Sequence, residues 1–323
     1  MSRPLIELKD LTKYFDISKT AKLHAVDGIT LNINEGETLG VVGESGCGKS
    51  TLGRTVLRLH EPTSGAILFD GEDITHCRAH KLAKVRRDMQ MIFQDPYSSL
   101  NPRMSVQELI AEPLLVAGQC GSRAEVYEKV ADLMDTVGLA SRLSGAYPHE
   151  LDGGRRQRIG VARALALNPR FIVCDEPVSA LDVSIQAQIL NLLMDLQEER
   201  NLTYMFITHD LSVVRHISHQ IAVMYLGKCV EYCDSKGLFK NPLHPYSKAL
   251  LSAIPVPNIA MRSKKPHVIR GEVTNPINPK PGCRFASRCP YAVEACTKAE
   301  IPFEEVEPGH YVACLKAKEL QND

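Results

Sequence analysis

A nine-residue segment, Gly43 to Thr51, constrains the fold more than any other part of the chain. It reads GESGCGKST and lies between the apolar stretch 38–42 and a helical pattern. This is the G-x-x-x-x-G-K-[ST] spacing of a phosphate-binding loop, placed between strand and helix as that loop requires. Its glycines reach backbone angles closed to other residues, so successive N–H groups can turn toward a polyphosphate. Taken alone, the loop could also be a glycine-rich turn that matches by chance.

Several residues of this segment have a predicted role. We expect Lys49 to reach the β- and γ-phosphates and the Ser50 hydroxyl to bind Mg²⁺. Cys47 stands at a helix start, where the pKa of a thiol can fall, although a small filler residue is the simpler interpretation. The predicted nucleotide-contacting residues of the loop are Gly43, Glu44, Ser45, Gly46, Cys47, Gly48, Lys49, Ser50 and Thr51.

The composition excludes some classes of protein. With 323 residues, the chain favours one large domain with an appendage. The 38 basic residues balance 38 acidic ones, so no global basic field indicates nucleic acid as a partner. No apolar run reaches the roughly 18 residues of a membrane helix, and the N-terminus lacks a signal-peptide core, so we expect a cytosolic protein. Ten cysteines are many for that compartment. Four of them indicate a local site near the C-terminus: Cys283, Cys289, Cys296 and Cys314.

Two carboxylates follow a buried strand predicted over residues 171–176. Asp175 and Glu176 end this apolar run. The carboxyl ends of strands are where ligands bind in open α/β sheets. An aspartate there is suited to Mg²⁺, and a glutamate to the role of general base for an attacking water.

Two more polar residues follow predicted strands. Gln94 comes after the strand predicted over 85–93, from which it could reach a Mg²⁺ and a water. His209 follows the strand predicted over 204–208 and could hydrogen-bond a γ-phosphate, although a lone histidine is more often structural.

The segment 151–158, LDGGRRQR, precedes a helical pattern. Two glycines before a helix offer free N–H groups to an anion, and Asp152 is a good N-cap. A capped helix start with a solvated arginine run is the favoured interpretation of this segment alone. Elsewhere, periodicity predicts strands at 4–9 and 27–34, a hairpin or strand pair at 64–74, a helical insertion from 106 to about 143, a helix at about 185–199 and a hairpin at 221–232.

Together and in this order, these motifs resemble the nucleotide-binding subunit of an ABC transporter, over residues from about 4 to 255. The resemblance implies an α/β fold, the P-loop NTPase ABC ATPase cassette. Its parts are a RecA-like core, an antiparallel β-subdomain and a helical subdomain at about 95–160 that contacts the membrane partner. It also implies ATP and Mg²⁺ as ligands, with Mg²⁺ held through Ser50, Gln94 and Asp175. Two such subunits pair head to tail, so each ATP lies between one chain's phosphate loop and the other's signature segment.

The resemblance also assigns roles to single residues. Phe15, favoured over Tyr14, is implied to stack on the adenine, and otherwise it would be a core or edge aromatic. Lys49, Gln94 of the Q-loop, Glu176 and the switch histidine His209 form the implied catalytic set. The implied D-loop is Ser179, Ala180, Leu181 and Asp182, and the implied signature segment is Leu151, Asp152, Gly153, Gly154 and Arg155.

The signature segment departs from the family, which usually has LSGGQ. Asp152 replaces the serine that would donate to a γ-phosphate. Like unit charges roughly 4 Å apart repel by about 4 kcal/mol at an effective dielectric constant of about 20. Arg155 could offset part of this cost. Because the segment serves the partner's ATP, we expect a heterodimer with a second, related ATPase whose signature is intact.

The C-terminal part narrows the family. Residues 241–250, NPLHPYSKAL, resemble the His-Pro-Tyr motif of dipeptide and oligopeptide importers. We therefore expect an ATPase domain over 1–255 and a short Cys-rich extension over 256–323. The four cysteines have the spacing C-x5-C-x6-C-x17-C, without the C-x2–4-C pairs of structural zinc sites. Four thiolates suit a [4Fe–4S] cluster, which the resemblance also implies. Zn²⁺, free thiols and a disulfide remain alternatives.

The resemblance implies an ATPase subunit that powers import of di- or oligopeptides, peripheral at the cytoplasmic face of the membrane. Its implied partners are a second ATPase, two transmembrane permease subunits and, indirectly, an extracytoplasmic substrate-binding protein. Nickel, glutathione or another small solute is an alternative cargo within this family. A soluble, non-transport ABC ATPase and a redox sensor are alternatives of other classes.

Overall fold

The computed structural model describes residues 3–254, 271 and 275–320. The chain forms two compact units. The first unit contains residues 34–37 and 76–207, and the second contains residues 4–33, 38–75 and 208–323. The domain boundary predicted at residues 255 and 256 lies outside the described residues. Within the described part of the chain, no helix is both long and apolar enough to span a membrane.

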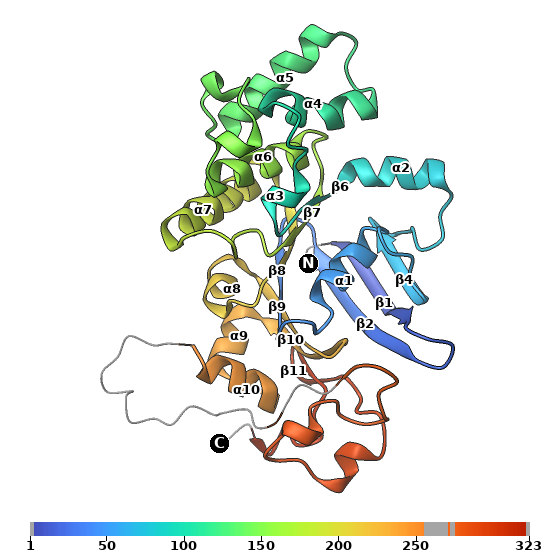
Figure 1. The fold of residues 1–323 in the computed structure, drawn as a ribbon. Coiled ribbons are helices and arrows are strands. Elements are labelled where there is room, and N and C mark those ends of the chain that lie inside the picture. Colours follow the sequence, from blue (N-terminus) through green and yellow to red (C-terminus); the bar gives the residue numbers. More distant parts are fainter. Residues whose placement is uncertain (1–2, 255–270, 272–274, 321–323) are drawn as a thin grey trace, which may run out of the picture. The chain divides into compact units, whose positions relative to one another are not determined.

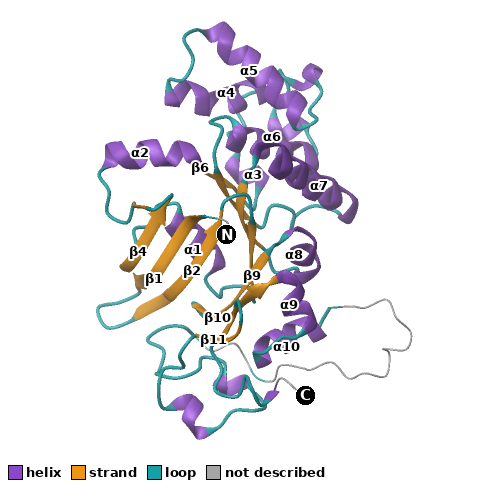
Figure 2. Ribbon diagram, turned by 180° about the vertical axis from the view of Figure 1, so that it is seen from behind, coloured by secondary structure: helices purple, strands orange, loops and turns teal. Residues whose placement is uncertain are grey.

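A four-stranded sheet in the second unit contains the N-terminal strands (Figure 2). Its order is β2-β1-β4-β5, and Ile6 of β1 lies opposite Phe69 of β4 in an antiparallel pair. The predicted strands at 4–9 and 27–34 are confirmed, but both are longer than predicted, and the pair predicted at 64–74 is confirmed. The strands are β1 (Pro4–Asp16), β2 (Lys22–Asn34), β4 (Ser64–Phe69) and β5 (Glu72–Asp73).

The second unit also contains the strands that support the phosphate loop, in the order β11-β12-β10-β9-β3. β3 is buried throughout and pairs in parallel with β9, as expected of a strand covered on both faces. The hairpin predicted at 221–232 is confirmed as β9 and β10. The strands are β3 (Thr38–Val42), β9 (Gln220–Tyr225), β10 (Lys228–Asp234), β11 (Glu304–Glu307) and β12 (His310–Val312). The helices of this unit are α1 (Lys49–Val56), α8 (Leu211–Ile217), α9 (Ser235–Lys240) and α10 (Pro245–Ser252).

The C-terminal segment joins this second sheet. β12 pairs antiparallel with β10, with Val312 opposite Glu231, and β11 pairs with β12. The preceding cysteine-rich stretch contains two short 3-10 helices, Ala286–Arg288 and Glu294–Thr297, and lies in the red part of the ribbon (Figure 1).

In the first unit, three parallel strands have the order β8-β7-β6, and helices α4, α5 and α6 pack against one another. The strand predicted over 85–93 was wrong in its first half. Residues 79–88 form a helix because they are mostly good helix formers, with Val85 the one β-branched residue. The elements are α2 (Ala79–Asp88), β6 (Met89–Ile92), α3 (Pro96–Ser99), α4 (Val106–Ala117), α5 (Arg123–Thr136), α6 (Gly153–Leu165), β7 (Phe171–Asp175), α7 (Val183–Arg200) and β8 (Thr203–Ile207).

Candidate functional site

The phosphate loop lies in the second unit, between β3 and α1. Two positions of the loop require glycine because backbone carbonyl oxygens of other segments lie close to them. A Cβ on Gly43 would lie 2.2 Å from the carbonyl oxygen of Met224, and one on Gly48 would lie 2.0 Å from that of Ala25. Both residues also have positive φ, +151° and +105°. No other residue type fits this turn without moving the backbone of its neighbours.

The start of α1 is open toward an anion. Among the described residues, no side chain caps this helix at Gly48, and its first turn has no acidic residue. The buried Lys49 Nζ donates hydrogen bonds to the carbonyl oxygens of Gly43, at 2.8 Å, and Glu44, at 3.0 Å. An ammonium group held beside an uncapped helix N-terminus is an arrangement that binds phosphate.

Cys47 is a packing residue in this loop. Its side chain is 2% exposed, and burial raises the pKa of the thiol. The Sγ atom would lie 2.8 Å from a Cβ on Gly43, so it fills space directly behind that glycine. A lowered thiol pKa is therefore wrong for Cys47, and the structure favours the small filler residue.

The two candidate adenine-stacking residues lie at the end of β1. The Tyr14 hydroxyl donates to Asp27 at 2.7 Å, and its ring stacks on His24 with centroids 3.7 Å apart. Phe15 contacts His60 edge to face at 5.4 Å and remains partly exposed. Tyr14 is thus engaged with protein groups on its ring and its hydroxyl, which favours Phe15. Adenine stacking itself stays a prediction.

In the first unit, the structure brings Gln94 and Glu176 together. The Gln94 Nε2 donates to the Glu176 carboxylate at 2.9 Å. Asp175, the last residue of β7, is fully buried, whereas Glu176 is partly exposed and has a positive φ of +47°. This left-handed conformation is uncommon for a glutamate and turns the chain sharply after the strand. His209 belongs to the second unit, where it is exposed just before α8.

The signature segment forms the start of α6 in the first unit. The Asp152 carboxylate accepts a hydrogen bond from Arg155 N–H at 2.8 Å and pairs with the Arg155 guanidinium at 3.2 Å, so the predicted N-cap is confirmed. A Cβ on Gly153 would lie 3.0 Å from Leu181 of the predicted D-loop. One on Gly154 would lie 2.7 Å from Ile185 of α7. These glycines therefore permit close packing of α6 on the neighbouring segment.

The four C-terminal cysteines face one apolar pocket in the second unit, lined also by His244 and Phe285. Burial and, to a smaller extent, the other three thiols raise the pKa of the Cys283 thiol to about 11. Thiols that line one apolar pocket are costly to ionise without a cation, and a metal group supplies that charge. The donor set fits a soft metal group held by Cys283, Cys289, Cys296 and Cys314.

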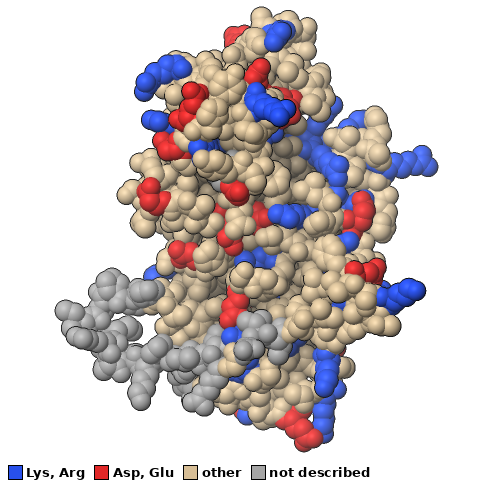
Figure 3. Space-filling model, viewed as in Figure 1, with Lys and Arg blue, Asp and Glu red and all other residues tan. Residues whose placement is uncertain are grey.

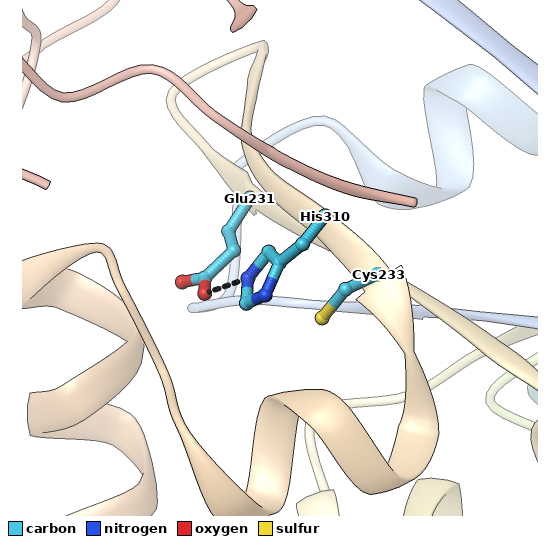
Figure 4. Close-up of side chains that lie close together, drawn as sticks. All are labelled: Glu231, Cys233 and His310. Atoms are coloured by element: carbon cyan, nitrogen blue, oxygen red, sulfur yellow. Dashed lines mark hydrogen bonds and ion pairs between the residues drawn. The ribbon is translucent and has the colours of Figure 1, made fainter. Parts of the chain in front are cut away.

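A second buried cluster, Glu231, Cys233 and His310, escaped the sequence analysis (Figure 4). The Glu231 carboxylate accepts hydrogen bonds from His310 Nε2 at 2.7 Å, from Leu243 N–H at 2.7 Å and from His244 N–H at 2.9 Å. Both of its oxygens are thus occupied by protein donors. The cluster is a structural tie between β10, β12 and the start of α10, and its one sequence signal is a charged residue inside an apolar strand pattern.

Comparison with known proteins places the chain in a family. Residues 26–179 match the family model described as ABC transporter, and residues 230–296 match the oligopeptide/dipeptide transporter, C-terminal region. The chain is 53% identical over 319 residues to the oligopeptide transport ATP-binding protein AppF of Bacillus subtilis, covering 96% of each chain. It is 50% identical over 325 residues to OppF of Salmonella typhimurium, covering 98% of this chain and 97% of that protein.

Solved structures agree with this result. The dimeric structure of MJ0796, a bacterial ABC transporter cassette, superposes with a TM-score of 0.65 at 31% identity, covering 71% of this chain and 98% of that one. The dimeric post-hydrolysis state of the same cassette, bound to ADP and Pi, gives the same values. The α/β fold, the phosphate loop and the full-length similarity thus agree, and the chain belongs to the ATP-binding subunits of ABC transporters, in the oligopeptide/dipeptide family.

Proposed function

We propose that this ABC ATPase hydrolyses ATP to power the import of di- or oligopeptides through a membrane transporter. The observation that carries the proposal is the open helix start at the phosphate loop, where Lys49 lies beside uncapped N–H groups. The relatives named as oligopeptide transport ATP-binding proteins match over nearly the whole chain, which supports peptides as the cargo.

In the proposed reaction, Phe15 stacks on the adenine, and the loop amides with Lys49 bind the phosphates. Glu176 accepts a proton from the attacking water, whose oxygen bonds to the γ-phosphorus while the bond from that phosphorus to the β–γ bridging oxygen breaks. Gln94 and His209 position the water and the γ-phosphate. Ser50, Gln94 and Asp175 would hold Mg²⁺, which when bound neutralises charge on the phosphates.

The assembly we propose has four subunits in the membrane complex. This chain pairs with a second ATPase, and both dock on two transmembrane permease subunits at the cytoplasmic face. An extracytoplasmic binding protein delivers the peptide to the permease subunits. Asp152 supports unequal ATPase subunits, because its carboxylate occupies the helix start that would otherwise face the partner's ATP. Charges of both signs are spread over the face seen in Figure 3.

We also propose that residues 256–323 form an extension whose four cysteines hold a [4Fe–4S] cluster, with Zn²⁺ as the alternative. Their common pocket supports a shared metal group. Anaerobic purification followed by metal analysis tests this directly. About four irons and four sulfides per chain, lost on Cys289→Ser, would support the cluster, whereas one zinc per chain would exclude it.

Reconstitution in vesicles with the permease subunits, the second ATPase and the binding protein tests the main proposal. We expect peptide uptake that requires ATP and that stops on Glu176→Gln. That substitution should lower the hydrolysis rate at least about 100-fold, since it removes the proton acceptor. Uptake of nickel or glutathione but not of peptides would contradict the proposed cargo. ATP hydrolysis at the wild-type rate in Glu176→Gln would contradict the proposed base.

A further inference from the structure

An arginine of the cysteine-rich segment, residues 283–314, contacts the phosphate loop. Arg288 immediately precedes Cys289, and its guanidinium forms a two-pronged ion pair with the carboxylate of Glu44, at 2.8 and 3.3 Å. The arginine side chain is 7% exposed and that of Glu44 is 26% exposed. Both residues belong to the second unit, although they lie 244 positions apart in the sequence.

The same loop residue is held a second time through its backbone. The N–H of Glu44 donates to the Tyr246 hydroxyl at 2.8 Å. Arg288 also hydrogen-bonds the Tyr225 hydroxyl at 3.2 Å, and the rings of Tyr225 and Tyr246 pack edge to face with centroids 4.7 Å apart. The side chain and the main chain of Glu44 are therefore both fixed by residues from the C-terminal half of the chain.

The charge of Glu44 gives this contact a consequence for binding. A carboxylate in a loop that must receive a polyphosphate repels the ligand unless a cation neutralises it. A paired guanidinium supplies that cation in a fixed orientation, which a lysine cannot do as well. Glu44 also lies next to Gly43 and supplies a carbonyl oxygen to Lys49, so its position affects the lysine that would contact the phosphates.

We propose that Arg288 is a positioning residue for the phosphate loop, and that the cysteine-rich segment sets the affinity for ATP by neutralising and fixing Glu44. The inference rests on the proposed function, because it assumes that the loop binds ATP. It holds whatever group the four thiols bind, since the contacts described above involve no metal ligand.

A double-mutant cycle on the full-length protein tests the proposal, with fluorescent ATP and ADP analogues as probes of binding. We expect Arg288→Gln to weaken ATP binding about tenfold, or about 1.4 kcal/mol, and ADP binding less, because the repulsion grows with the charge of the ligand. In a Glu44→Gln background, the same substitution should change ATP affinity by less than about twofold, since no carboxylate is left unpaired. Arg288→Lys should give an intermediate loss.

Arg284→Gln is the matched control. Arg284 lies in the same segment and its side chain is also 7% exposed, but its guanidinium bonds Asp27 and the Leu226 carbonyl instead of Glu44. We expect it to weaken ATP and ADP binding equally, whether Glu44 is present or not. Equal losses of ATP affinity from Arg288→Gln in the wild-type and Glu44→Gln backgrounds would overturn the proposal and make Arg288 a purely structural residue.

Lys49→Ala distinguishes failure of this inference from failure of the proposed function. If Lys49→Ala abolishes ATP binding while Arg288→Gln has no effect, the inference alone fails. If Lys49→Ala binds ATP like the wild type, the proposed nucleotide site fails as well.

Discussion

Two helix starts in this molecule contain paired or nearby glycines, and they differ in what occupies them. At α1, the start has no side-chain cap among the described residues, and Lys49 lies beside it. At α6, the protein's own carboxylate, Asp152, accepts the hydrogen bond that an incoming anion would need. Glycine before a helix is therefore not enough to indicate an anion site, because the neighbouring side chains decide whether the N–H groups are available.

Glycine is required for different physical reasons at the two helix starts. Gly43 and Gly48 face backbone carbonyls, which cannot move without shifting a strand. Gly153 and Gly154 face the side chains of Leu181 and Ile185, which can change rotamer. Substitution should thus cost binding at α1 but mainly packing at α6.

The largest expected effect is that of Gly48→Ala compared with Gly154→Ala. The new Cβ at position 48 would meet a carbonyl oxygen at 2.0 Å in a left-handed backbone conformation, so the loop must deform. We expect ATP affinity, measured by fluorescent analogue titration, to fall at least about 100-fold. For Gly154→Ala we expect a smaller loss of affinity and a decrease of about 1–3 kcal/mol in the free energy of unfolding. Equal losses of affinity would remove the distinction between the two helix starts.

A smaller effect should follow from removing the negative charge at the start of α6. In a Glu176→Gln background, which would slow hydrolysis, Asp152→Ser removes the negative charge but keeps a capping oxygen. We expect ATP-dependent self-association, measured by light scattering, to strengthen about tenfold, since repulsion of the partner's γ-phosphate is relieved. Asp152→Asn is the matched control that removes the charge at nearly constant size, and it should act in the same direction. Unchanged self-association in both variants would contradict the charge argument.

The start of α10 is a third case, because its capping side chain, His244, can be protonated. His244 Nδ1 accepts a hydrogen bond from Tyr246 N–H at the start of α10, and burial lowers the pKa of this imidazole to about 4. The unfolded chain, with an ordinary histidine pKa near 6.5, binds the proton first, so the free energy of unfolding should fall as pH decreases from about 6.5 toward 4. Between pH 7.5 and 5.5 we expect a loss of about 1 kcal/mol in urea denaturation. His244→Asn keeps a cap that does not titrate, and an equally steep pH dependence in that variant would refute this origin.

Local patterns in the sequence predict the parts of the site that lie next to a strand end. The phosphate loop follows β3 and the Asp175-Glu176 pair follows β7, because an apolar run followed by polar residues is visible in a single stretch of sequence. Gln94 and Glu176, which follow β6 and β7, form a hydrogen bond, while their roles in catalysis stay predictions.

Contacts between distant segments were beyond such patterns. Arg288 and Glu44 are each ordinary charged residues in their own stretch, and only the fold brings them together. The prediction of a strand from residue 85 was wrong because it extended the apolar strand Met89–Ile92 backward into residues that belong to a charged helix. At Cys47 burial agrees with the favoured interpretation as a filler residue, because a helix start lowers a thiol pKa only where the thiolate remains solvated.

The three hydrogen bonds to Glu231 have a consequence for how the protein is made. During synthesis, β10 and the amides of Leu243 and His244 leave the ribosome well before His310. Until β12 has left the ribosome, the edge of β10 lacks its neighbouring strand and the Glu231 carboxylate lacks its hydrogen bond to His310. The sheet that contains β3, β9 and β10 therefore cannot finish folding while β12 is still inside the exit tunnel.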